Sequence, residues 1–112
     1  MEILFQNNRL RKDFNNDKLL IRRYGALQAK LIQRRLVEIR AANTLEDLRT
    51  LPRARCHELK GNRAGQISVD VQHPQRLLFE CGNNPVPRKP DGGLDWKQVT
   101  VIVIIGVENT ND

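Results

Sequence analysis

The chain has 112 residues and a net charge of +6 at pH 7, from 19 Lys and Arg against 13 Asp and Glu, and we expect residues 1–112 to form a single domain around one modest core. Residues 1–63 carry 15 basic and 7 acidic side chains whereas residues 64–112 carry 4 and 6, so the basic half indicates an anionic partner. No run approaches the roughly 20 apolar residues of a membrane-spanning helix, and the N-terminus lacks a signal-peptide pattern. We therefore expect a cytoplasmic protein whose anionic partner is nucleic acid and not a membrane.

The N-terminal part predicts one short strand followed by helices. Residues 2–6 form the candidate strand, and Asn15 or Asn16 supplies a cap for a long helix over residues 17–42. Apolar residues recur there every three or four positions, the period of one buried stripe: Leu20, Tyr24, Leu27, Leu31, Ile32, Leu36 and Ile39. The solvated side is expected to hold Arg22, Arg23, Lys30, Arg34 and Arg35. Thr44 begins a second, short helix.

The C-terminal part predicts strands. Three short, partly alternating runs lie at residues 55–59, 66–71 and 76–81, separated by turn sequences, and predict an antiparallel meander. Residues 82–98, rich in proline and glycine, predict a loop without regular structure, and the apolar run 99–107 predicts a central strand covered on both faces. We therefore expect an α+β fold, with two N-terminal helices packed on one face of a four- to five-stranded antiparallel sheet.

The two cysteines, Cys56 and Cys81, are expected to be thiols, because disulfides are uncommon in intracellular proteins. Two cysteines and two histidines without a ligand-like spacing do not indicate a zinc site. We expect no metal and no cofactor.

The stretch from Leu51 to Glu80 sets a histidine, a lysine and several arginines beside strand-patterned sequence. His57 and Lys60 are three apart, which on a straight strand puts them on opposite faces, but the turn pair after Lys60 allows them to converge. Arg63 follows that turn, and Arg76 opens a later strand that can fold back beside it. Such a group of titratable and cationic side chains suits a phosphate-bearing substrate.

This block resembles the RelE/ParE toxin superfamily, and more closely its HigB, or plasmid maintenance killer, branch. The branch pattern HxLKGxRxGxxSV with an arginine on the next strand is matched by His57, Leu59, Lys60, Gly61, Arg63, Gly65, Ser68, Val69 and Arg76. A loop with Pro87 and residues 92–96 is also similar, and we expect Trp96 there to anchor a lid on the core. The resemblance covers most of the chain and rests on the order of several motifs. It implies a RelE-like fold.

The resemblance also implies a function. HigB-like toxins of type II toxin–antitoxin systems are mostly ribosome-dependent, metal-independent endoribonucleases, which cut mRNA in the ribosomal A site and inhibit translation. His57 and Lys60 stand at catalytic positions of the branch and Arg76 at that of a strand arginine near the scissile phosphate, with Arg63 as a further candidate. Attack by a ribose 2′-hydroxyl needs a base, an acid and cations, and histidine, with an ordinary pKa of about 6.5, suits proton transfer near neutrality.

The implied partners are a cognate HigA-like antitoxin, in a higher-order complex, and the ribosome with its mRNA. Arg53 and Arg55 are expected to bind RNA because they lie close to the candidate site.

The C-terminus departs from the branch, in which many members end in an Asp-Tyr-His type of sequence. Asn109, Thr110 and Asn111 stand in those positions here, and none of them titrates near pH 7. We expect Asn109 and Asn111 to lie near the site without acting as base or acid. Two alternatives therefore stay open: a ParE-like toxin acting on DNA gyrase, and a catalytically weak toxin that retains antitoxin binding.

Overall fold

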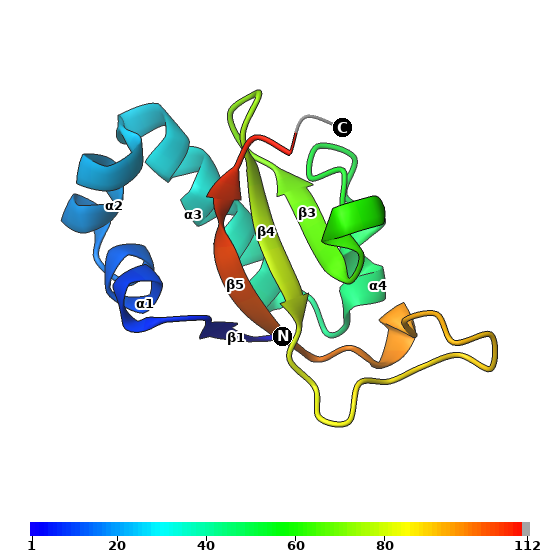
Figure 1. Cartoon of the computed structure of the whole chain (residues 1–112). Coiled ribbons are helices and arrows are strands. Elements are labelled where there is room, and N and C mark those ends of the chain that lie inside the picture. Colours follow the sequence, from blue (N-terminus) through cyan, green and yellow to red (C-terminus); the bar gives the residue numbers. More distant parts are fainter. Residues whose placement is uncertain (111–112) are drawn as a thin grey trace.

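The computed structural model describes residues 1–110, which form one five-stranded sheet with four helices (Figure 1). The helices are α1 (Asn8–Phe14), α2 (Asp17–Tyr24), α3 (Ala26–Ala41) and α4 (Leu45–Leu48). The strands are β1 (Glu2–Phe5), β2 (His57–Glu58), β3 (Gln66–Asp70), β4 (Arg76–Cys81) and β5 (Val101–Glu108). Short 3-10 turns are η1 (Gly61–Arg63) and η2 (Trp96–Gln98). The expected α+β class is confirmed.

The sheet is mixed, with strand order β1-β5-β4-β3-β2. The pairs β2–β3, β3–β4 and β4–β5 are antiparallel, as the meander predicts. β1 pairs in parallel with β5, from Glu2 opposite Val101 to Phe5 opposite Ile104, so the sheet is not antiparallel throughout. The chain between the first and last strands is long enough for the crossover that a parallel pair requires.

The expected long helix over residues 17–42 is two helices, because a break at Gly25 interrupts the apolar stripe. Gly25 ends α2 with φ of +85°, a left-handed conformation that favours glycine, and α3 starts at the next residue. Asn16 caps α2 as predicted, since its side chain accepts from the backbone of Lys18. α1 was not predicted; its cap is Asn7, whose side-chain oxygen accepts a 2.9 Å bond from Leu10.

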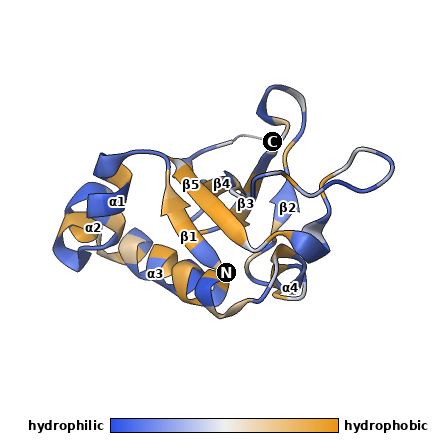
Figure 2. Ribbon diagram, turned by 90° about the horizontal axis from the view of Figure 1, so that it is seen from below, coloured by the Kyte–Doolittle hydropathy of each residue, from blue (hydrophilic) through white to orange (hydrophobic). Residues whose placement is uncertain are grey.

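The hydrophobic core lies between α3 and one face of the sheet (Figure 2). Its fully buried centre includes Ile32 and Ile39 of α3, Ile67 of β3, Leu77 and Phe79 of β4 and Ile104 of β5. The last strand alternates: Ile102 and Ile104 are buried, whereas Val101 and Val103 are partly exposed. The expectation that this strand is covered on both faces was wrong. No α-helix covers the face of the sheet opposite α3 in the described part of the chain (Figure 1), so polar and charged side chains can lie there.

Candidate functional site

The predicted site lies on the face of the sheet turned away from α3. Two rows of cross-strand partners define it: His57, Ser68 and Leu78 in one, and Asp70, Arg76 and Glu108 in the next. Side chains directly opposite each other in a strand pair share a face. The alternating neighbours of these residues, such as Ile67 and Leu77, belong to the core, so the two rows lie on the opposite face of the sheet. Ser68 and Leu78, in the middle of that face, are themselves fully buried, whereas the outer residues are reached by solvent. We call this surface the open face.

His57 lies on edge strand β2 and is half-buried. Its Nδ1 is 2.8 Å from the backbone oxygen of Arg55. A carbonyl oxygen only accepts, so Nδ1 carries the proton in this bond, and a neutral ring then keeps Nε2 as an acceptor. The free nitrogen of His57 is therefore available to receive a proton from a bound molecule.

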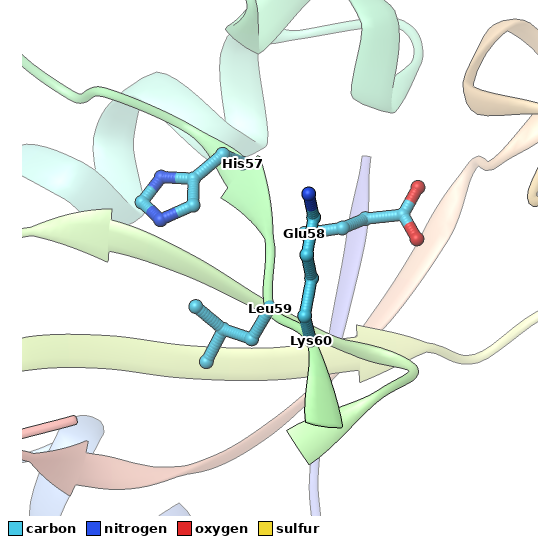
Figure 3. A pocket seen from close by; sticks show the side chains of 4 residues that line it. All are labelled: His57, Glu58, Leu59 and Lys60. Carbon is cyan, nitrogen blue, oxygen red and sulfur yellow. The ribbon is translucent and has the colours of Figure 1, made fainter. Parts of the chain in front are cut away.

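A pocket of about 350 Å³ runs beside β2 and is lined by His57, Glu58, Leu59 and Lys60. Figure 3 shows the His57 and Glu58 side chains pointing to opposite sides of the strand. Lys60 precedes η1 and is exposed, and its ammonium makes no hydrogen bond or ion pair with residues 1–110. Lys60 thus lines the same pocket as His57, together with Glu58, and its ammonium is available to a bound molecule.

Arg63 reaches across the open face from η1. One terminal nitrogen donates to Gln66 at 3.1 Å and the other to the Glu108 carboxylate at 3.1 Å, although Arg63 and Glu108 are 45 positions apart in sequence. Glu108 is the strand partner of Arg76. The two predicted arginines are therefore brought to the same part of the open face by the side chain of Glu108.

Arg76 is held at the start of β4 by two neighbours. Its Nη1 donates to the Thr110 hydroxyl at 3.1 Å, and its Nε is 3.8 Å from the Asp70 carboxylate. Asp70 also pairs with Arg55, at 3.6 Å. One carboxylate between two guanidinium groups leaves this cluster with a net positive charge.

The C-terminal segment folds back onto the open face. Thr110 is 8% exposed and contacts Arg76, so one of the residues in the positions of the family's terminal motif is an anchor for a site cation. Asn109 lies directly before it and is exposed. Asn111, the other tail residue expected near the site, lies outside the described residues.

Arg35 was missed as a site residue, because it was placed on the solvated side of the long helix. It is only 5% exposed, and its guanidinium donates to the backbone oxygen of Asp70 at 2.6 Å, to that of Arg53 at 3.0 Å and to the Glu38 carboxylate at 2.8 Å. A signal was present: Arg35 follows Ile32 by three and precedes Ile39 by four, the period of the buried stripe. From α3, Arg35 thus holds the backbones of Asp70 and Arg53, which border the site.

The expected RNA-binding residues have further contacts through their backbones. Arg53 has an exposed side chain, and its carbonyl oxygen binds Arg35. Arg55 donates from its side chain toward Asp70 and offers its carbonyl to His57. Both residues thus belong to the framework around the site.

The loop between β4 and β5 extends away from the sheet (Figure 1), and Trp96 ties it down. The indole is 5% exposed, its Nε1 donates to Glu58 at 2.5 Å, and the Arg49 guanidinium carbon lies 3.8 Å from the ring centre. Trp96 is therefore an anchor on the core, as predicted. Since Glu58 points away from His57, this anchor lies on the other side of β2 from the site.

Cysteine chemistry does not enter the open face. Cys56 and Cys81 are free thiols, and burial raises the pKa of Cys56 to about 12, against a smaller opposing effect of Arg49. A thiol with such a pKa is not a thiolate at neutral pH and is a poor nucleophile. Within residues 1–110, no three His, Cys, Asp or Glu side chains are grouped closely enough to hold a metal ion.

Comparison with known families gives a match over most of the chain. The family model of HigB-like toxins, described as the RelE-like toxin HigB of type II toxin–antitoxin systems, matches residues 3–89. The matched range includes His57, Lys60, Arg63 and Arg76 and ends before β5 and the tail. A search of curated proteins found no significant match. None of the helices in the described part of the chain is long and apolar enough to cross a membrane.

Proposed function

The chain belongs to the HigB-like toxins, the RelE-like toxins of type II toxin–antitoxin systems, and a cognate antitoxin is its partner; we propose that it is a ribosome-dependent endoribonuclease that cuts mRNA. One observation carries this proposal: His57, with Nδ1 bound to a carbonyl and Nε2 free, lies on the same open face as Arg63 and Arg76. A proton acceptor beside phosphate-binding cations is the arrangement that cleavage by a 2′-hydroxyl needs.

In the proposed reaction, His57 Nε2 takes the proton of the 2′-hydroxyl while the 2′-oxygen forms a bond to the phosphorus. The bond between phosphorus and the 5′-oxygen breaks, which leaves a 2′,3′-cyclic phosphate and a 5′-hydroxyl. Lys60, whose ammonium is exposed at the same pocket, supplies the proton to the leaving 5′-oxygen. One acid and one base complete the proton balance without a titrating tail residue.

Arg76 and Arg63 stabilise the negative charge of the crowded phosphorus centre. A guanidinium offers two parallel donors that match two phosphate oxygens. The acidic partners of these arginines are weak competitors: Asp70 is 3.8 Å from Arg76, and Glu108 is half-exposed to solvent. Thr110 keeps Arg76 oriented, and Asn109 precedes Thr110 in the tail.

Aromatic placement supports dependence on the ribosome. The ring of Phe14 packs edge-on against Phe5 and Tyr24, and Phe79 and Trp96 are buried. None of the five is a stacking platform on the open face, which isolated single-stranded RNA usually requires. In the proposed mechanism the ribosome presents the mRNA to the site, which Arg53 and Arg55 border. The basic N-terminal half docks on ribosomal RNA, and the reaction takes place in the cytoplasm. A higher-order toxin–antitoxin complex is proposed on the family relation alone.

Primer extension on a reporter mRNA in a purified translation system tests this function. Wild-type protein is expected to produce cuts within the reading frame that disappear when ribosomes are omitted. A 2′-deoxynucleotide at a mapped cut position should block that cut alone, because the attacking hydroxyl is missing. Absence of cuts at high protein concentration rejects the proposal, and DNA breaks that depend on gyrase would identify the ParE-like alternative instead.

Glu108→Gln is expected to improve substrate binding, because it releases the guanidinium of Arg63 from an ion pair. Exposed ion pairs contribute little, so we expect a decrease of about 1.5- to 5-fold in the KM for programmed ribosomes. The matched control is Glu46→Gln, which removes the exposed Glu46–Arg49 pair on α4 and should leave KM unchanged. A KM that stays constant or rises in Glu108→Gln contradicts a role of Arg63 in phosphate binding.

A further inference from the structure

Arg55 is the one non-glycine residue among residues 1–110 with a positive φ, at +46°. The left-handed region is unfavourable for a residue with a Cβ, and arginine has no local side-chain bond that compensates for it. A conformation of this kind persists only where the surroundings hold it, and such residues cluster at functional sites. The residue lies two positions before His57.

Two hydrogen bonds to backbone carbonyls hold the turn that contains Arg55. Arg35 donates to the carbonyl of Arg53 at 3.0 Å, and the backbone nitrogen of Asp70 donates to the carbonyl of Ala54 at 2.7 Å. The ion pair between the Asp70 carboxylate and the Arg55 guanidinium, at 3.6 Å and largely exposed, adds little to these bonds. The buried Arg35 also binds the backbone of Asp70, at 2.6 Å. The turn is thus clamped between α3 and the end of β3.

This clamp directs the Arg55 carbonyl oxygen at His57 Nδ1, 2.8 Å away. We propose that Arg55 is a positioning residue for the proposed reaction: its left-handed backbone, not its guanidinium, fixes the proton on His57 Nδ1 and leaves Nε2 as the base. Without that carbonyl, the ring divides between its two tautomers and rotates more freely. Only the fraction of molecules in which Nε2 is unprotonated and oriented toward the substrate is then reactive.

The alternative for Arg55 is direct RNA binding by its side chain, which is 68% exposed. The two roles predict different substitution patterns. Arg55→Gly, Arg55→Asn and Arg55→Val all remove the guanidinium, so they affect RNA binding equally. Glycine and asparagine accept a positive φ, whereas the β-branched valine strongly disfavours it.

Positioning predicts that the kcat for mRNA cleavage is tenfold to 100-fold lower in Arg55→Val than in Arg55→Gly and Arg55→Asn, while the three variants share the same KM. Equal losses in all three variants, through KM and with a weaker salt dependence, would assign the residue to RNA contact and overturn the proposal. Thermal unfolding is measured in parallel. Should Arg55→Val not fold, Arg55→Ala takes its place, because alanine disfavours a positive φ less severely.

Nitrogen NMR of the histidine rings gives a readout that needs no activity. At a pH where both rings are neutral, His57 of the wild-type protein is expected to be protonated at Nδ1, while the exposed His73 shows the mixture of an unconstrained ring. Arg55→Val should move His57 toward the His73 pattern, and Arg55→Gly should not. A wild-type His57 that already matches His73 rejects the inference. A wild-type protein that holds the Nδ1 proton but cuts no mRNA rejects the proposed function alone.

Discussion

His57→Ala is expected to lower ribosome-dependent mRNA cleavage by about 10²- to 10⁴-fold, the usual contribution of a general base. The residue is only half-buried and lies on a two-residue edge strand, so the loss should appear in kcat and not in folding. Single-turnover cleavage of mRNA on stalled ribosomes measures the chemical step directly.

The matched control for this variant is His73→Ala, which removes the other histidine of the chain from an exposed turn. It should cut mRNA at the wild-type rate. Both variants should unfold at nearly the wild-type temperature. Full cleavage by His57→Ala would remove this side chain from the mechanism and leave Lys60 and the arginines as the remaining candidates for proton transfer.

Arg76→Ala is expected to lower cleavage by about 10²- to 10³-fold, because it removes a cation aimed at the phosphate in the transition state. The cleavage rate of Arg76→Lys should lie between those of the wild type and Arg76→Ala, since lysine keeps the charge and lacks the two parallel donors. The same single-turnover assay, combined with ribosome binding, separates loss of rate from loss of affinity.

Arg40→Ala is the charge-matched control, because Arg40 is an exposed residue of α3 on the other side of the sheet from the open face. Arg40→Ala should reduce activity little. Both variants lose one positive charge, so any effect of net charge on ribosome binding is the same in the two and cancels in the comparison. Arg76→Ala also removes the bond to Thr110, so Thr110→Val provides a second comparison. If Arg76→Ala cleaves at the wild-type rate, phosphate stabilisation must be assigned to Arg63 or Lys60.

Asp70 links the parts of the site. Its carboxylate lies between Arg55 and Arg76, and its backbone binds Ala54 on one side and Arg35 on the other. Arg76 and the turn that contains Arg55 are therefore fixed to the same residue. In the proposed reaction, this arrangement would hold the cations in place before substrate binds, which lowers the entropic cost of ordering them.

Local patterns in the sequence were sufficient for several elements. β4 begins and ends where the alternating run predicts, Asn16 caps its helix, and Thr44 starts the short α4. These features depend on neighbouring residues, since capping and strand alternation act over a few positions. The helix break at Gly25 was harder to predict, because the apolar period continues across it.

The sequence by itself determined the α+β class, the HigB-like family and the order of His57, Lys60, Arg63 and Arg76 along the chain, because these follow from local periodicity and motif spacing. Tertiary structure alone decided the contacts between distant segments. The parallel pairing of β1 with β5 and the bond from Arg63 to Glu108 join residues far apart in sequence.

The burial of Arg35 and the bond from His57 to the Arg55 carbonyl likewise arise only when α3, the turn before β2 and the end of β3 meet. A charged side chain is buried only where fixed acceptors meet its donors, and the fold assembles those acceptors from separate parts of the chain.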